Sequence, residues 1–146
     1  MARRATGAAL ARPYFLSLLA EAQGATGQPA AGRTALTEAF TLAETSGESW
    51  YVPELYRLKG TLLLHQSPDH QVEAAVCFQH AIRSAQSQHA KSLELRAATS
   101  LARLWQQQGK RAEAQALLAP IYGWFTEGFD TADLQEARAL LEELGR

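Results

Sequence analysis

A repeat of about 40 residues is the feature that most limits what this 146-residue chain can fold into. Gly7 and Gly47 are 40 positions apart, and so are Pro13 and Pro53. Small residues recur later in each unit, with separations of 42 and 40, at Gly32, Ala74 and Ala114. Self-similarity with a fixed period of 20 to 50 residues is typical of repeat architectures.

Each unit carries the pattern of helices. Apolar residues in its second half follow the i, i+3, i+4, i+7 spacing of an amphipathic helix. The three stripes are Leu36, Ala39, Phe40 and Ala43; Phe78, Ala81, Ile82 and Ala85; and Leu117, Leu118, Ile121 and Phe125. Prolines suit a first helical turn and glycines suit a tight turn between helices. Such residues stand at the expected boundaries: Pro13, Pro29, Pro53 and Pro68, with Gly27 and Gly109. No segment supports a strand, so we predict an all-α fold.

The predicted organisation is one domain over residues 1–146, an α-solenoid of three antiparallel helix pairs and a C-terminal capping helix. Its parts are 1–12 as the remnant of a preceding helix and loop, 13–46, 47–90 and 91–126 as repeats, and 131–145 as the capping helix. Small residues at helix crossings allow close approach. We therefore expect the first helices to face the second at Ala20 with Gly32, Gly60 with Ala74, and Ala102 with Ala114.

The segment LARLWQQQGKRAEAQALL resembles a tetratricopeptide repeat. The matching positions are Leu101, Ala102, Trp105, Gly109, Ala114 and Leu118. The units here have a period of 40–42, longer than the usual length of about 34 residues, which implies longer helices. From GESWYVPELYRLKGTLLL onward, the chain also looks like the C-terminal end of large bacterial signalling ATPases. In that family a nucleotide cyclase or DNA-binding output domain precedes a P-loop ATPase and a repeat array. The resemblance implies a cytoplasmic signalling protein, present here as a fragment or a truncated relative.

Composition narrows the classes of partner. A net charge of −1 and a pI of about 6.4 lack the basic footprint of nucleic-acid-binding proteins, and no polybasic membrane patch is present. The N-terminal segment loosely imitates a signal peptide, but Arg12 and Pro13 interrupt its apolar part. The single cysteine, Cys77, excludes an internal disulfide and a multi-cysteine metal site, and we expect it to pack as a small apolar group.

Catalytic motifs are missing from the sequence. The GKR at 109–111 lacks the earlier glycine and the following Ser or Thr of a phosphate loop, and GESWY lacks the closing glycine of a nucleophile elbow. The four histidines, His65, His70, His80 and His89, lack the spacing of metal ligands. A metal between His65 and His70 is one interpretation, and solvated turn residues are the favoured one. We predict neither an enzyme nor a cofactor.

The resemblance to tetratricopeptide repeats implies a concave face, lined by the first helices, that holds a peptide or helix. The residues carried over to it are Tyr14, Ser17, Glu21, Glu54, Arg57, Thr61, Leu64, Arg96, Thr99, Arg103 and Gln106. The three arginines among them suit an acidic or phosphorylated partner. The alternative, which is favoured, is that they pair with Glu54, Glu94 and solvent.

The aromatic stretch IYGWFTEGFDTADL precedes the last helix. Ile121 and Phe125 continue a core stripe, whereas Tyr122 and Trp124 fall off it and form a possible secondary binding surface. Asp130 or Thr131 is expected to cap the last helix. The apolar face expected for that helix comprises Leu134, Ala137, Leu141 and Leu144.

These features together predict a non-catalytic protein–protein interaction module, the terminal repeat part of a signal-responsive regulator. One alternative is a sensor that binds a small ligand on the concave face. Another is self-association into a homodimer through an N-terminal apolar edge, formed by Tyr14, Phe15, Leu18 and Leu19.

Overall fold

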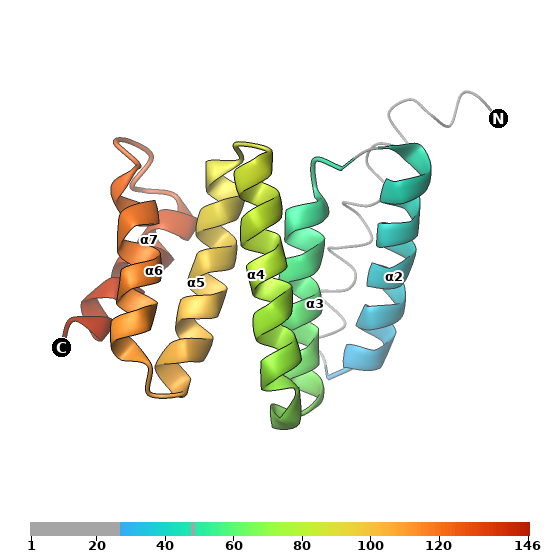
Figure 1. Ribbon diagram of the computed structural model, residues 1–146, viewed down its shortest axis with the longest axis horizontal. Coiled ribbons are helices and arrows are strands. Elements are labelled where there is room, and N and C mark those ends of the chain that lie inside the picture. Colours follow the sequence, from blue (N-terminus) through green and yellow to red (C-terminus); the bar gives the residue numbers. More distant parts are fainter. Residues whose placement is uncertain (1–26, 48) are drawn as a thin grey trace.

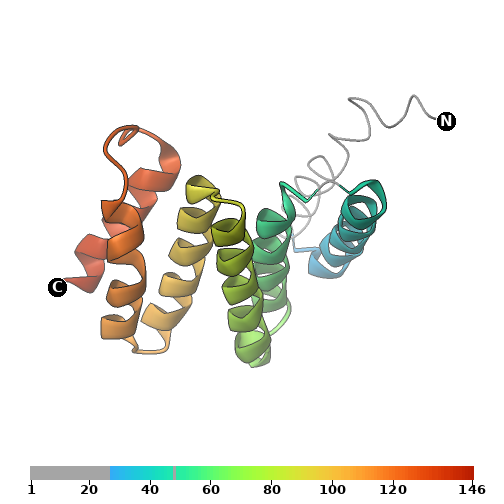
Figure 2. The same cartoon turned by 45° about the horizontal axis from the view of Figure 1, so that its top comes forward.

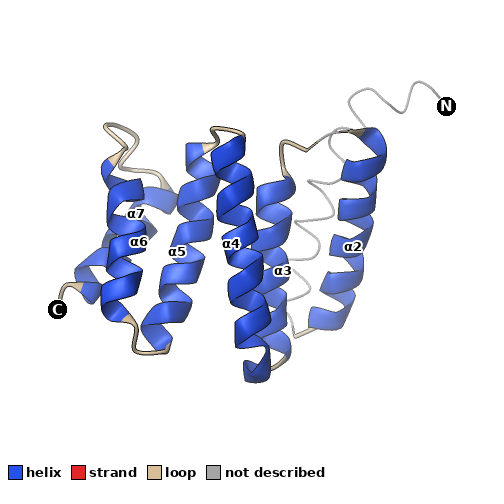
Figure 3. Cartoon of the chain, viewed as in Figure 1, coloured by secondary structure: helices blue, strands red, loops and turns tan. Residues whose placement is uncertain are grey.

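The computed structural model describes residues 27–47 and 49–146, and this part of the chain is helical without a β-strand (Figure 3). Its α-helices are α2 (Pro29–Ser46), α3 (Val52–Gln66), α4 (Gln71–Ser87), α5 (Lys91–Gln107), α6 (Arg111–Gly123) and α7 (Ala132–Leu144). A short 3₁₀ turn, η2 (Pro68–His70), precedes α4. The all-α prediction is confirmed for these residues. The expected first helix of the first unit lies outside them, together with the predicted N-terminal edge.

Helices that follow one another in the chain lie side by side, from α2 at one end to α6 and α7 at the other (Figures 1 and 2). Helix α3 also packs against α5, and α7 packs against both α5 and α6. The connections α2–α3, α4–α5 and α6–α7 all lie at the same end of the helices, along the top in Figure 1. Aromatic and polar residues from separate connections therefore share that end.

Apolar stripes on the second helices form the core as the sequence predicts. All four residues of the α4 stripe are buried, as are Leu118 and Ile121 on α6. Leu117 and Phe125 are half-buried against the same core. On α2, Leu36, Ala39 and Ala43 are buried, and Phe40 packs against the cluster between α2 and α3.

Gly60 lies where α3 and α4 approach each other closely. A Cβ atom added there would stand 2.6 Å from the Phe78 ring, well inside van der Waals contact. Close contact at Gly60 is therefore confirmed. Its nearest neighbour is the ring of Phe78, and not Ala74 as expected, because the ring reaches across the crossing onto the bare α3 backbone. A glycine inside a helix costs about 0.5–1 kcal/mol, and burial of the Phe78 ring compensates for that cost.

The last helix begins and packs much as predicted. The hydroxyl of Thr131 accepts a hydrogen bond from the backbone N–H of Leu134 at 3.4 Å, so Thr131 is the N-cap. The expected apolar face was wrong at one position, since Leu140 is buried and Leu141 only half-buried. Because α7 contacts two helices, its apolar face is wider than the single stripe used for the prediction.

Candidate functional site

A buried carboxylate stands at the start of α3. The side chain of Glu54 is only 4% exposed, and it accepts hydrogen bonds from Arg57 Nε at 2.8 Å and Arg57 Nη2 at 2.5 Å. Arg96 of α5 donates a third bond from Nη1, at 3.1 Å. A buried charge is tolerated only when it is paired and hydrogen-bonded, and Glu54 meets both conditions with two guanidinium groups.

Arg96 joins three helices that are not consecutive in the chain. Besides Glu54 on α3, its guanidinium contacts Asp133 on α7, with Nη2 2.9 Å from Oδ2. Burial opposes the charge of Arg96. The hydrogen bonds that Arg96 donates to Asp133 and the attraction of Glu54 and Asp133 outweigh that effect, so the pKa of Arg96 is raised above its ordinary value.

The third predicted arginine is also paired within the chain. Arg103 Nη2 lies 3.1 Å from Glu136 Oε2 on α7. The favoured interpretation, that the arginines pair with Glu54, Glu94 and solvent, is right for Glu54 and wrong for Glu94, whose described partners are Lys91 and Gln86. The contacts of Arg96 with Asp133 and of Arg103 with Glu136 were missed, because the sequence did not place α7 beside α5.

The remaining described residues predicted to bind a partner are more buried than expected. The Thr99 hydroxyl is buried and donates to the Leu95 carbonyl at 2.8 Å, and Thr61 donates in the same way to the Arg57 carbonyl at 3.1 Å. Leu64 is half-buried against the core, and Gln106 is half-buried. Tyr14, Ser17 and Glu21 lie outside the described residues.

Replacing Arg96 by alanine is expected to lower the free energy of unfolding by about 1–2 kcal/mol. Removing one partner of a fully buried pair costs about 3–5 kcal/mol. Arg96 is 36% exposed and Glu54 retains Arg57, so the effect is smaller here. Urea denaturation measures it. Arg103→Ala, which removes a more exposed pair, is the matched control and should cost under about 0.5 kcal/mol. Equal effects would contradict the bridging role of Arg96.

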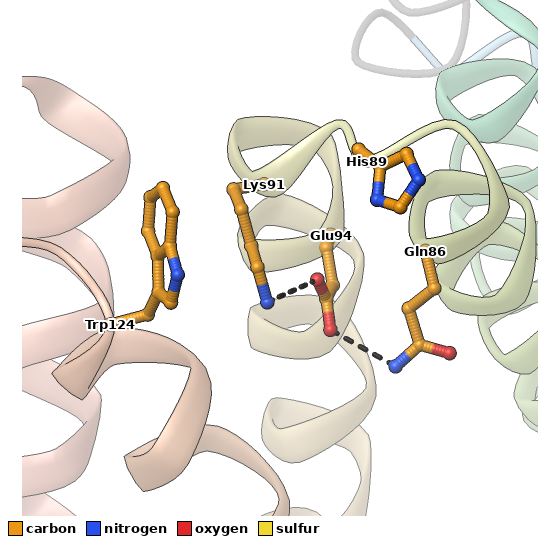
Figure 4. A pocket seen from close by; sticks show the side chains of 5 residues that line it. All are labelled: Gln86, His89, Lys91, Glu94 and Trp124. Carbon is orange, nitrogen blue, oxygen red and sulfur yellow. Dashed lines mark hydrogen bonds and ion pairs between the residues drawn. The ribbon is translucent and has the colours of Figure 1, made fainter.

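A surface pocket of about 390 Å³ lies at the same end of the helices, between the α4–α5 connection and the residues after α6. It is lined by Gln86 of α4, His89 of the following connection, Lys91 and Glu94 of α5, and Trp124 after α6 (Figure 4). Glu94 is 3% exposed, and its carboxylate is held by Gln86 Nε2 at 3.0 Å and Lys91 Nζ at 3.2 Å. The Lys91 ammonium also lies 5.4 Å from the centre of the Trp124 ring, within cation–π range.

His89 adopts a backbone conformation that non-glycine residues avoid, with φ of 58°. It closes α4 in a turn in which the Ala90 N–H donates to the Ala85 carbonyl at 2.9 Å. The same turn closes α5, where the Lys110 N–H donates to the Trp105 carbonyl at 2.8 Å and Gly109 takes the left-handed position with φ of 80°. A histidine therefore stands at the pocket rim in a turn whose left-handed position is taken by glycine at the end of α5.

The His89→Gly variant is expected to raise the free energy of unfolding by about 0.5–1 kcal/mol. The left-handed conformation costs a non-glycine residue about 1–2 kcal/mol, and the greater freedom of glycine in the unfolded chain offsets part of the gain. Urea denaturation again measures the change. Gly109→Ala is the matched control in the equivalent turn and should lower stability by about 1 kcal/mol. Stabilisation by Gly109→Ala would contradict this account.

The two residues predicted as a secondary surface differ in the structure. Trp124 is 58% exposed and contacts the edge of Phe125, with ring centres 5.2 Å apart. Tyr122 is half-buried against the core, beside Phe129 at 6.0 Å. Of the pair, Trp124 is the one whose ring is exposed to solvent.

The sequence did not predict that Lys91, Gln86 and His89 line one pocket, and Glu94 was expected only as an ion-pair partner of an arginine. One signal was available: an acid followed by leucine recurs in the first turn of alternate helices, as Glu54–Leu55, Glu94–Leu95 and Asp133–Leu134. The leucines of all three pairs are buried. That repeat aligns the starts of α3, α5 and α7, and it marks Glu94 as the counterpart of Glu54.

Other candidate chemistry is sparse. Within residues 27–47 and 49–146, no three His, Cys, Asp or Glu side chains are grouped as a metal site would need. Cys77 is buried in the core as expected, and desolvation raises the pKa of its thiol. His70 is turned inward, with Nδ1 3.2 Å from the Leu63 carbonyl, while His65 is exposed. None of the described helices has the length and apolar character needed to cross a membrane.

Comparison with known proteins finds no counterpart. The chain matches no protein-family model, and no curated protein or solved structure shows significant similarity to it. The resemblances to tetratricopeptide repeats and to bacterial signalling ATPases therefore stay predictions from the residues quoted above.

Proposed function

We propose that this chain is a non-catalytic protein-interaction module that binds a segment of a partner protein at the end formed by the helix connections. The observation that carries the proposal is the exposed indole of Trp124 at the rim of the pocket around Glu94. Tryptophan and arginine dominate the binding energy of protein interfaces, and an indole with 58% exposure is costly to leave in water.

The order of packing supports a repeat scaffold for this surface. Each described helix packs on its neighbour in the chain, and first helices also pack on one another through α3, α5 and α7. This arrangement fits an α-solenoid with tetratricopeptide-like pairing, which is how we interpret the molecule. In repeat arrays the loops that carry insertions lie on one face, which is often the face that binds a partner.

The partner surface proposed here differs from the concave face predicted from the sequence. On that face Arg57, Arg96 and Arg103 already pair with acidic side chains of α3 and α7. An acidic partner would have to displace those contacts before it gained any of its own. The Trp124 ring at the pocket rim is exposed and can be contacted without breaking any of these arginine pairs.

A small-ligand sensor is the second candidate, because a volume of about 390 Å³ falls within the range of ligand pockets. Such pockets are mostly apolar and enclose their ligand. Among the described lining residues Trp124 is the one large apolar side chain, and the others, Gln86, His89, Lys91 and Glu94, are polar. This lining suits a single side chain of a partner better than an engulfed molecule.

Selection of a displayed random-peptide library on the immobilised protein tests the proposal. We expect an enriched peptide family whose affinity, measured by calorimetry, falls at least about tenfold in Trp124→Ala. Trp50→Ala is the matched control, since Trp50 is 49% exposed but does not line the pocket, and it should bind the same peptides unchanged. Failure to enrich any peptide, or equal binding by both variants, would count against the proposed surface.

A further inference from the structure

We propose that the pocket around Glu94 is a receptor for a guanidinium group, so that an arginine side chain of the partner binds there in place of the ammonium of Lys91. This inference rests on the proposed function and names the residue type that the pocket recognises. Its elements are a buried carboxylate, an exposed indole face and a cation that belongs to the chain itself (Figure 4).

The carboxylate of Glu94 is the centre of the site. It lines the pocket although the residue is only 3% exposed, because the Lys91 side chain and the Gln86 amide cover it. Its partners are thus one ammonium and one neutral amide. A planar guanidinium can donate parallel hydrogen bonds to both carboxylate oxygens at once. An ammonium lacks this forked geometry and interacts as a point charge.

The chain contains its own example of the filled site. Glu54, the counterpart of Glu94 forty positions earlier, is equally buried and is bonded by two guanidinium groups, those of Arg57 and Arg96. The Arg57 contact is of the forked type, with Nε on one oxygen and Nη2 on the other. A carboxylate at this place in the helix is therefore satisfied by arginine wherever the chain supplies one.

Among the described residues, no arginine contacts Glu94. The position that corresponds to Arg57 is the buried Ala97 on α5, and the one that corresponds to Arg96 is Gln135 on α7. These correspondences follow the acid–leucine pairs that align α3, α5 and α7. Glu94 is consequently the less completely paired of two equivalent carboxylates, and it is the one that lines an open pocket.

Lys91 is a weak occupant of this site. It precedes Glu94 by three residues, an order less favourable than acid before base, and it places a cation in the first turn of α5, where the helix dipole disfavours it. Its side chain is 36% exposed, so the ammonium can move into solvent without opening the core. The indole of Trp124 then offers its face to the guanidinium, and arginine stacks on aromatic rings better than lysine.

Titration with four short peptides tests the proposal on the intact chain: acetyl-Ala-Arg-Ala-amide and the versions with lysine, citrulline or glutamate in place of arginine. The readout is the NMR signal of the Trp124 indole N–H. We expect the arginine peptide to shift it at the lowest concentration and neutral citrulline to have no effect. Lys91→Met should tighten arginine binding by about tenfold, because it vacates the carboxylate, and Glu94→Gln should abolish it.

The sign of the Lys91→Met effect decides between ligand classes. If Lys91 itself served as the binding group for an anion, this variant would lose the glutamate peptide and gain nothing with arginine, and the guanidinium proposal would be overturned. Equal binding of arginine and citrulline would overturn it as well. Should Glu94→Gln fail to fold by circular dichroism, Trp124→Ala gives the second measurement, with binding of the arginine peptide followed by calorimetry and at least a fivefold loss of affinity expected.

Failure of this inference is distinguishable from failure of the proposed function. Library peptides that lack arginine but still depend on Trp124 would leave the interaction module standing and remove the guanidinium site. A library that yields no binder, together with no response to the arginine peptide, would remove both.

Discussion

Replacing Phe78 by alanine is expected to lower the free energy of unfolding by about 3–5 kcal/mol, the largest effect of any single change proposed for this protein. The ring is 1% exposed and fills the space above Gly60, where α3 and α4 cross. Its removal loses the transfer free energy of a phenyl group and leaves a cavity, because the glycine backbone offers no side chain to fill it. Urea denaturation followed by circular dichroism measures the change.

The exposed neighbour Gln79 provides the control for that experiment, and Gln79→Ala should change stability by less than about 0.5 kcal/mol. A second control exploits the contact with Gly60. Gly60→Val alone should be destabilising by overpacking, at about 1–3 kcal/mol, and the loss in the double variant with Phe78→Ala should be less than additive. Strict additivity would show that the two residues do not share the contact described here.

The second large effect is expected at α7, where Leu140→Ala should lower the free energy of unfolding by about 2–4 kcal/mol. Leu140 is 1% exposed and belongs to the core that α7 shares with α5 and α6. The prediction separates two ways of holding this helix, by apolar burial or by ion pairs. Exposed ion pairs contribute about 0–1 kcal/mol each, so burial should dominate.

Leu141→Ala is the matched control for Leu140, since the same substitution falls on a half-buried neighbour and should cost about half as much or less. The ion-pair account makes the opposite prediction. Suppose that Arg103→Ala lowered the free energy of unfolding as much as Leu140→Ala at low salt, and that both losses vanished at high salt. Ion pairs would then be the main interaction that holds α7.

The helical fold was predictable because its signals are local. The stripe from Phe78 to Ala85 needs only the 3.6-residue period, and Pro29, Pro53, Gly27 and Gly109 mark helix ends through their own backbone limits. Each of these residues carries its constraint wherever it stands in a chain. The structure therefore confirms them within the described residues.

The site was less predictable because it depends on which helices are neighbours. The ion pair of Arg96 with Asp133 joins residues 37 apart, and nothing in either local segment announces it. The contact between Lys91 and Trp124 likewise requires α5 and the end of α6 to lie together. Of the pocket residues, only Trp124 was predicted as a binding surface, because it lies off the apolar stripe. The same argument also selected Tyr122, which is half-buried in the structure.

The left-handed backbone at His89 was also hidden from pattern reasoning. Histidine does not signal a helix end as glycine does, so the turn after α4 had no sequence mark. The turn is recognised from the structure, because it has the same hydrogen bond as the turn at Gly109.

The guanidinium of Arg96 also bears on how the molecule unfolds. In a linear array of helices each element stabilises only its immediate neighbours, so the ends can fray while the middle stays intact. Arg96 ties α3 to α7 through side chains, although three α-helices, α4, α5 and α6, separate them in the chain. Loss of α7 thus removes a partner from the residue that covers Glu54. Amide protons at the start of α3 and at the start of α7 should then exchange as one cooperative unit.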